Sequence, residues 1–174
     1  AGGFTHAYKR KGYEWDVGIH YIGEVHRENS ALRKIFDYIT NSQLRWSPME
    51  DVYDRMIFGN DHYDFVSGAT RWKEKLIAYF PQERKAIEQY LDLVFQVHQS
   101  SRAYFAEKAL PPFLAKIVHP LMSSKFNKLS KQTTKQVLSG LTQNQKLLGV
   151  LSGQWGGDYG MPPSQSSFAI QAMI

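Results

Sequence analysis

The sequence predicts an α+β protein that is mostly helical and carries a small antiparallel sheet. Two observations indicate strands: polar and apolar residues alternate from Phe4 to Ile22, and β-branched and aromatic residues return between Gln43 and Gly68. A third observation, the helical spacing of apolar residues that dominates after Gly68, indicates helices. We expect the 174 residues to form one domain, with a hairpin over 1–23, a small antiparallel sheet over 43–68 and a helical region over 69–174.

The first segment has the sequence pattern of a hairpin, with two short strands on either side of Lys11-Gly12. Asn29 or Ser30 then caps a helix that ends near Asn41 and carries apolar residues at helical spacing, namely Leu32, Ile35, Phe36 and Ile39. In the second strand region, Gly59-Asn60-Asp61 is a turn signal. This region is therefore a second hairpin or a three-stranded meander.

The helical region begins with a helix marked by Trp72, Leu76 and Tyr79. After Pro81 a longer helix is expected to place five apolar residues on a common face, namely Ile87, Leu91, Val94, Phe95 and Phe105. Pro111-Pro112 ends it, because a proline nitrogen donates no helical hydrogen bond.

Beyond the proline pair, an apolar piece is expected to break at Pro120, and helices follow around Ser130 to Leu138 and Thr142 to Leu151. Thr142 and Gln145 have the spacing of a capping box. The segment Gly153 to Gly160 contains four glycines, which favours a tight loop that approaches a ligand or a neighbouring backbone. The final apolar run, Phe168 to Ile174, has the pattern of a helix that is unfinished where the sequence stops.

Composition excludes several classes of site. The chain has no cysteine, so disulfides, thiolate metal sites and thiol nucleophiles are excluded, and a reducing compartment is consistent with this. No apolar run is long enough to span a membrane, and no signal peptide opens the chain. We expect a cytoplasmic protein that contacts a membrane at its periphery. Because the first residue is Ala1 rather than Met, a start inside a longer protein is plausible.

The positive charge is concentrated in one stretch. Between Lys108 and Gly157 there are seven lysines, no arginine and no acidic residue, whereas the rest of the chain has 14 basic and 16 acidic residues. Such a stretch can face water, an anionic lipid surface or nucleic acid. Nucleic acid is the weakest of the three, because no aromatic and basic motif of a known module accompanies the lysines.

Motifs for common chemistries are absent. No pair among the six histidines has the i, i+4 spacing of a zinc site, and no Gly-x-Ser-x-Gly elbow surrounds a serine, so we expect no metal and no serine nucleophile. The chain also lacks Gly-x-Gly-x-x-Gly after a strand and lacks a phosphate-binding loop. By itself it is not expected to hold a dinucleotide tightly.

Both ends of the chain nevertheless resemble one family of flavoproteins. Gly2-Gly3-Phe4 and the stretch from Gly12 to Gly23, Gly-Tyr-Glu-Trp-Asp-Val-Gly-Ile-His-Tyr-Ile-Gly, resemble the segment after the first βαβ unit of the phytoene desaturase, carotenoid isomerase and retinol saturase family. The block from Gly153 to Phe168 looks like a second segment of the retinol saturase-like branch. The family's first strand, its glycine-rich turn, its ribose-binding acidic residue and the C-terminal segment that completes the flavin site have no counterpart in this sequence.

The resemblance implies FAD as the cofactor of a longer parent and a polyene lipid, a carotenoid or a retinoid, as its substrate. It also implies hydride transfer between the flavin and a C=C bond, with saturation, desaturation and isomerisation all open. The residues it places at the flavin are Gly2, Gly3, Asp16, Gly18, His20 and Tyr21. Seven residues are candidates for the walls of a long apolar slot: Trp46, Phe58, Phe65, Phe113, Met122, Trp155 and Tyr159.

The sequence therefore predicts the substrate-binding part of an FAD-dependent oxidoreductase, inactive without the FAD-binding domain of the same polypeptide. The stretch from Lys108 to Lys146 is then a candidate docking face for an anionic membrane, centred on Phe113 to Phe126. The alternative is a non-catalytic helical module that binds lipid or protein. Surfaces that would meet the FAD-binding domain are a reason to expect self-association of the isolated chain.

Overall fold

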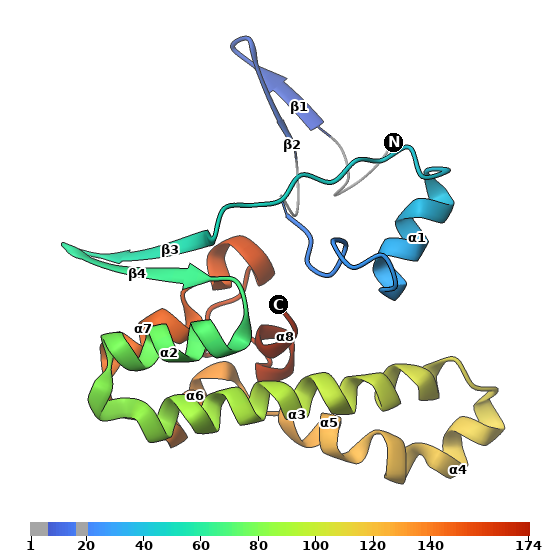
Figure 1. Cartoon of the computed structure of the whole chain (residues 1–174). Helices are drawn as coiled ribbons and strands as arrows, with labels where there is room; N and C mark the ends of the chain where they lie inside the picture. Colours follow the sequence, from blue (N-terminus) through green and yellow to red (C-terminus); the bar gives the residue numbers. More distant parts are fainter. Residues whose placement is uncertain (1–6, 17–20) are drawn as a thin grey trace. The chain divides into compact units, whose positions relative to one another are not determined.

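The chain folds into two compact units, residues 1–50 and residues 51–174. The structure, a computed structural model, describes residues 7–16 and 21–174 (Figure 1). Among these residues, helices predominate and the strands form two separate antiparallel pairs. The predicted α+β class, mostly helical with small antiparallel sheets, is confirmed.

The first unit begins with the expected hairpin. Strands β1 (Ala7–Arg10) and β2 (Tyr13–Asp16) pair antiparallel, and the turn residues Lys11 and Gly12 have φ angles of 52° and 82°. A two-residue turn with both φ angles positive matches the twist of the strands it joins, and glycine adopts this conformation without strain. The hairpin at Lys11-Gly12 is confirmed.

The same unit contains the expected first helix, α1 (Ala31–Ile39). The Ser30 hydroxyl accepts a hydrogen bond from the Arg33 amide at 3.1 Å, so Ser30 rather than Asn29 is the N-cap. The Arg33 guanidinium then pairs with Asp37 at 2.9 Å and donates to the Val25 carbonyl at 3.2 Å. The bond to Val25 ties the helix to the chain that precedes it.

The second unit begins with a hairpin of β3 (Val52–Phe58) and β4 (Asp61–Val66), so the hairpin alternative was right for this segment and residues 43–50 form no strand. In β4, Tyr63, Phe65 and Val66 are buried, whereas Asp64 pairs with Arg55 across the hairpin and with Lys75 of the following helix. Period-two alternation thus turns the aromatic side chains of β4 toward the helices.

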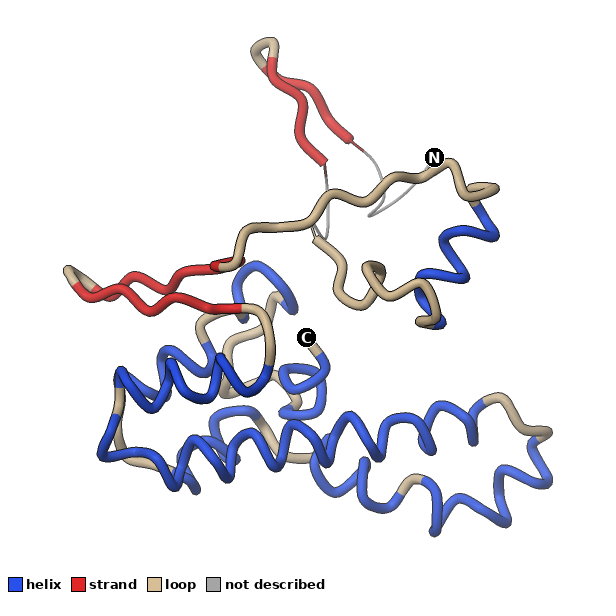
Figure 2. The backbone as a smooth tube through the Cα atoms, in the orientation of Figure 1, coloured by secondary structure: helices blue, strands red, loops and turns tan. Residues whose placement is uncertain are grey.

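The helices of this unit follow in chain order: α2 (Ala69–Tyr79), the short 3-10 turn η2 (Pro81–Glu83), α3 (Arg84–Lys108), α4 (Pro112–Met122), α5 (Ser124–Ser130), α6 (Thr134–Leu141), α7 (Gln145–Ser152), the π-helical turn η3 (Trp155–Tyr159) and α8 (Phe168–Met173). Helix α3 is the longest, and α2, α4, α5, α6 and α8 all contact it (Figure 2). The C-terminal part of α3 and α4 extend beyond the other helices of the unit.

Three sequence predictions about these helices were wrong. Helix α4 continues through Pro120, since a proline two residues from the helix end removes only one hydrogen bond. Residues 124–141 form two helices, α5 and α6, rather than one around Ser130 to Leu138. Thr142 is not a cap: Asn144 caps α7, and the capping box belongs to Thr133 and Gln136 at the start of α6.

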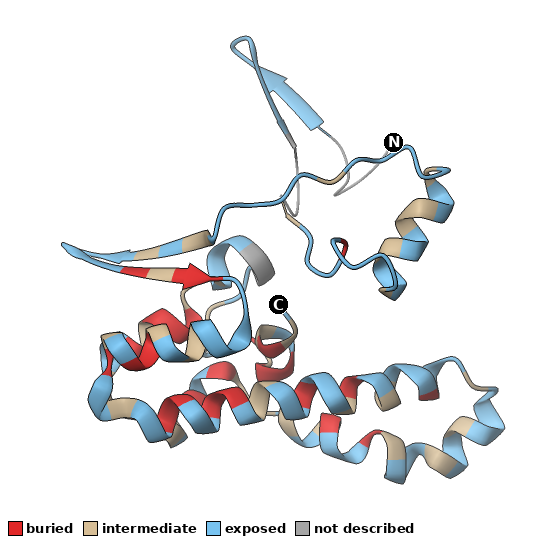
Figure 3. Ribbon diagram, viewed as in Figure 1, coloured by how far each residue is buried: buried red, intermediate tan, exposed pale blue. Residues whose placement is uncertain are grey.

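The core of the second unit is one cluster of apolar side chains (Figure 3). Its most deeply buried members come from α2, α3, α6, α7 and α8: Leu76, Ile87, Val97, Leu138, Leu147, Val150 and Phe168. On the expected face of α3, Ile87 and Leu91 are buried, but Phe95 and Phe105 are each 56% exposed. That face therefore leaves the core toward its C-terminal end.

Helix α7 approaches the β3 strand closely. A Cβ atom added at Gly149 would lie 3.1 Å from the Phe58 ring, and one at Gly153 would lie 2.6 Å from the Met56 sulfur. Lys146 at the other end of α7 pairs with Asp61 of β4. The expectation that the glycine-rich block approaches a neighbouring segment holds for Gly153, while Gly156 and Gly157 face open space and Gly160 has a positive φ of 72°.

Candidate functional site: an aromatic groove in the second unit

A groove of about 220 Å³ lies between the β3–β4 hairpin and helices α2, α3 and α8. Five aromatic side chains line it, namely Tyr53, Phe65, Trp72, Tyr90 and Phe95. Three polar side chains also line it, namely His98, Gln154 and Gln171. A mostly apolar concave site with a few polar groups is the usual form of a small-molecule site.

The sequence places these rings by simple periodicities. Phe65 is an inward position of β4, and its ring packs against Trp72 of α2 with a centroid distance of 4.1 Å. On α3, Tyr90, Val94 and His98 recur every fourth residue and so share one face of the helix. The mouth of the groove includes Phe95, whose side chain is more than half exposed.

A polar contact closes the floor of the groove. The Gln171 amide nitrogen donates to the Tyr90 hydroxyl oxygen at 3.0 Å and to the Leu151 carbonyl at 2.9 Å, which fixes the orientation of the amide. Its amide oxygen is buried and has no hydrogen-bond partner among the described residues. Burial raises the pKa of Tyr90, so its hydroxyl stays protonated.

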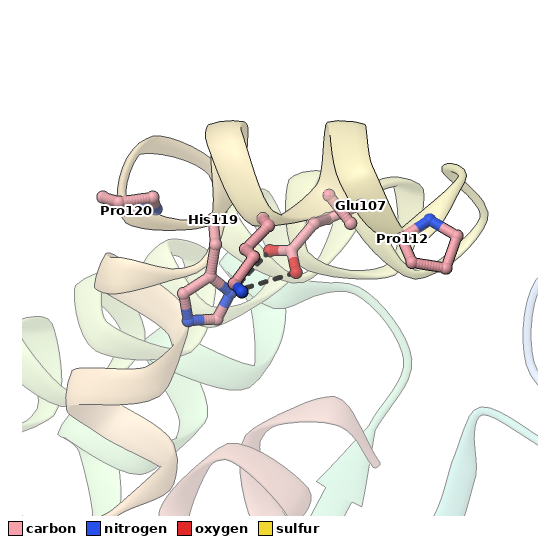
Figure 4. A pocket seen from close by; sticks show the side chains of 6 residues that line it. Glu107, Pro112, His119 and Pro120 are labelled. Carbon is pink, nitrogen blue, oxygen red and sulfur yellow. Dashed lines mark hydrogen bonds and ion pairs between the residues drawn. The ribbon is translucent and has the colours of Figure 1, made fainter.

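A second cavity, of about 340 Å³, lies where α3 meets α4 and is lined by Glu107, Pro112, Ala115, Lys116, His119 and Pro120 (Figure 4). The Glu107 side chain is almost completely buried and accepts hydrogen bonds from Ser123, His119 and Lys108. These donors, the Ser123 hydroxyl first and His119 next, lower the pKa of Glu107 to about 2. The carboxylate is therefore ionised at neutral pH.

This second cluster holds two helices together and is not a nucleophilic site. We call Glu107 and its three donors, Lys108, His119 and Ser123, the Glu107 clamp. Ser123 and His119 both donate to the same carboxylate, so the carboxylate orients each of them separately and no base activates the serine. The bonds join the last turn of α3 to α4 and to the residue after it. Among the described residues, no group of three His, Asp or Glu side chains is placed to hold a metal.

The predicted slot residues are not brought together. Phe65 lines the groove, and Phe58 lies on the same hairpin against α7. Trp46 belongs to the first unit, where it packs edge-on against Phe36 at 5.0 Å. Phe113 and Met122 lie on α4, Trp155 lies in η3, and the side chain of Tyr159 is outside the described set. The assignment of these seven residues to a substrate slot stays a prediction.

The predicted cofactor residues lie mostly outside the described part of the chain. Four of them are not described, namely Gly2, Gly3, Gly18 and His20. Asp16 ends β2, and its side chain is not described. Tyr21 is half-buried. In the described hairpin, every residue from 7 to 15 is exposed. The assignment of these six residues to a flavin site stays a prediction.

Sequence reasoning missed the groove residues Trp72, Tyr90 and Gln171 as site residues. One signal for Gln171 was present, because it is a polar residue inside the apolar run Phe168 to Ile174. Tyr90 lay on the apolar face of α3 and had no feature that distinguished it from core. Its partner in the groove is 81 residues away in sequence, a pairing that only the tertiary structure provides.

The chain was compared with known proteins. No family model matches it, and no solved structure matches it significantly. Over its whole length it is 36% identical to a zebrafish (Danio rerio) protein named all-trans-retinol 13,14-reductase, and 34% identical to the human protein of the same name. The homologues of this chain are all-trans-retinol 13,14-reductases, or retinol saturases. The predicted resemblance to the retinol saturase branch is confirmed.

Two further facts qualify this similarity. The chain spans about 30% of the length of these curated relatives. Another zebrafish relative, 29% identical over 187 residues, is named an inactive all-trans-retinol 13,14-reductase. One relative is therefore named as lacking the activity, and similarity to these proteins alone does not establish catalysis.

The predicted cytoplasmic location was wrong. The relatives are named all-trans-retinol 13,14-reductase, and nothing found for this chain indicates the cytoplasm. Within residues 7–16 and 21–174, no helix has the length and apolar character needed to cross a bilayer.

Proposed function

We propose that this chain is the substrate-binding part of an FAD-dependent oxidoreductase that acts on a retinoid or a similar polyene lipid. The observation that carries the proposal is the aromatic groove, in a chain homologous over its full length to proteins named for a reaction of retinol. The same oxidoreductase is expected to have a two-domain organisation, with the FAD bound mainly by its other domain.

The lining of the groove suits a conjugated hydrocarbon chain. Aromatic rings offer broad apolar surface, and burial of apolar surface is the main favourable term for such a ligand. The volume of about 220 Å³ is below the ~300–1,000 Å³ usual for ligand sites. We therefore assign one end of a long polyene to the groove, with the rest of the molecule leaving past Phe95.

Retinol binding by the 174-residue chain tests the groove directly. Phe95→Asp places a charge at its mouth, and we expect this variant to bind retinol at least about tenfold more weakly, because the carboxylate would lose solvation against the polyene. Phe105→Asp is the matched control, since Phe105 lies on the same helix with the same 56% exposure and does not line the groove. Retinol fluorescence titrated with protein gives the dissociation constants.

The two variants separate the outcomes. Loss of binding in Phe95→Asp with retention in Phe105→Asp supports the groove. Equal loss in both variants, or unchanged binding in both, contradicts it. Ala69→Trp, which fills the groove from α2, provides a second variant that adds no charge.

The flavin part of the proposal needs a longer protein. FAD supplies the redox chemistry when bound, and we expect the isolated chain to be inactive. A full-length protein that contains this chain should be yellow after gentle purification and should release FAD on denaturation. A colourless full-length protein with no releasable flavin would contradict the assignment.

A second candidate function is a helical lipid-binding module without catalysis. The relative named as inactive favours keeping this candidate. The two functions give different results with the full-length protein, because a binding module would take up retinol at the groove and leave its C=C bonds unchanged when a reductant is supplied.

A further inference from the structure

Helix α4 carries an apolar surface that no described residue covers. None of its eleven residues is buried, whereas α2, which has the same length, buries Leu76 and Ile77 (Figure 3). Phe113, Ile117 and Leu121 are 71%, 64% and 86% exposed. Their spacing of four residues places them in one stripe along the helix. We call these three residues the α4 stripe.

An exposed stripe of this kind is unusual for a helix in water. Contiguous exposed apolar side chains generally mark a surface that meets another protein or a membrane. Leu114, beside the α4 stripe, is 43% exposed. These large side chains are in contact with water, so α4 lacks the favourable free energy that other amphipathic helices gain from burial of their apolar face.

The charges near the stripe have one sign. Lys108, Lys116 and Lys125 are exposed, and no acidic residue occurs between residues 108 and 157. The nearest carboxylate, Glu107, is buried and hydrogen-bonded to Ser123, His119 and Lys108. Lys108 pairs with Glu107, whereas Lys116 and Lys125 have no carboxylate partner among the described residues. A surface built from apolar side chains and such lysines complements anionic phospholipid.

We propose that α4 docks on the surface of an anionic phospholipid bilayer, with the α4 stripe in the acyl region and the lysines against the headgroup phosphates. Eleven residues are too few to span a bilayer as a helix, whereas an apolar stripe with lysines beside it suits a helix lying in the interface. This docking is independent of the groove, because α4 contributes no residue to the groove lining.

The Glu107 clamp gives the docking helix a fixed position. Figure 4 shows Glu107 and His119 pointing toward each other across the junction of α3 and α4. The stripe residues are not part of this contact, so the clamp holds α4 and leaves the stripe free to meet the bilayer. A helix already ordered before binding loses less conformational freedom when it docks.

Vesicle flotation of the 174-residue chain tests the docking. The vesicles are phosphatidylcholine alone or phosphatidylcholine mixed with phosphatidylserine. We expect the chain to float with the anionic vesicles and to be recovered at least about fivefold less with the neutral ones, as expected for several lysines near the headgroups. Equal recovery with both, or none with either, would overturn the proposal.

Two variants and their controls locate the contact. Phe113→Ser, Ile117→Ser and Leu121→Ser together should lower recovery with anionic vesicles by at least about tenfold, because three large side chains no longer enter the bilayer. Ile57→Ser, at a side chain of 61% exposure on β3, should leave it unchanged. Lys116→Glu with Lys125→Glu should also release the chain, and Lys85→Glu on the first turn of α3 should not.

Amide hydrogen exchange distinguishes membrane docking from contact of the α4 stripe with a second copy of the chain. Added anionic vesicles should slow amide exchange of residues 112–122 in the wild-type chain. Self-association that disappears in the triple serine variant, together with no vesicle-dependent protection, would mean that the stripe meets a second copy and would overturn the proposal. Circular dichroism of each variant shows whether its fold is retained, and the exposed positions make a loss of fold unexpected.

Discussion

The carboxylate of Glu107 accepts a hydrogen bond from Nδ1 of His119, at 3.0 Å to one oxygen and 3.1 Å to the other. The two residues are twelve positions apart and join the end of α3 to α4. The contact positions a helix that contributes no side chain to the buried core.

Removal of the Glu107 charge is expected to weaken this junction. Glu107→Gln keeps the size of the side chain but replaces a charged acceptor by a neutral one, and charge-assisted hydrogen bonds are the stronger kind. We expect a decrease in Tm of several degrees and faster amide exchange in residues 112–122. Glu88→Gln, at an exposed carboxylate on the same helix, should change Tm by less than one degree or so. An equal effect of both substitutions would remove the special role of Glu107.

The same carboxylate predicts a pH dependence. Its pKa in the folded chain is lowered to about 2 from an ordinary value of 4.5, so the unfolded state binds the proton more readily. The contribution of Glu107 to stability is therefore complete above about pH 4.5 and is lost as the pH falls toward 2. Urea unfolding followed between pH 6 and 3, in roughly unit steps, should show wild-type stability falling more steeply than that of Glu107→Gln. Parallel curves would contradict the assignment.

Buried and exposed leucines should differ strongly in their contribution to folding. Leu147 of α7 is 0% exposed, and Leu147→Ala should lower the free energy of unfolding by about 2–5 kcal/mol through lost burial and the cavity it leaves. Leu121→Ala, at a side chain that is 86% exposed, should change it by no more than about 0.5 kcal/mol. Chemical denaturation measures both. A large loss for Leu121→Ala would show that α4 is covered in solution.

The close approach at Gly153 predicts an interaction between two substitutions. Gly153→Ala would bring a Cβ atom to 2.6 Å from the Met56 sulfur and 3.1 Å from the Gly149 carbonyl, and overpacking of this kind costs about 1–3 kcal/mol. Gly156→Ala meets nothing within 4 Å and is the control. In a Met56→Ala background the cost of Gly153→Ala should decrease, and a double-mutant cycle on unfolding free energies measures the difference. Simple additivity would mean that the sulfur is not the obstacle.

Local sequence patterns predicted most of the secondary structure. The Lys11-Gly12 hairpin, a cap at Asn29 or Ser30 and the long helix after Pro81 all depend on residues near one another in sequence, and all three were found, with Ser30 as the cap. One error arose where a distant contact decided the role of a residue. Thr142 and Gln145 had capping-box spacing, but Thr142 donates to Glu83 at 2.7 Å, a partner 59 residues away, and Asn144 takes the cap.

The candidate site was less predictable than the fold. Phe65 was selected as a slot residue and lines the groove, yet Tyr90 and Gln171 were not selected. Aromatic residues of core and of groove look alike in a sequence, because both occupy inward positions of strands and helices. The contact that closes the groove floor joins α3 to α8, and no local pattern indicates which inward-facing residues of two distant helices will meet.

The packing of α7 on β3 also has a consequence for how this sequence can vary among related proteins. Gly149 faces Phe58, and Gly153, one turn later, faces Met56, so each glycine leaves room for one large side chain on the strand. A homologue with a larger residue at position 149 or 153 should carry a smaller one at position 58 or 56. We therefore expect two pairs of positions to covary among related proteins, 56 with 153 and 58 with 149, because the distance between helix and strand limits the combined size of each pair.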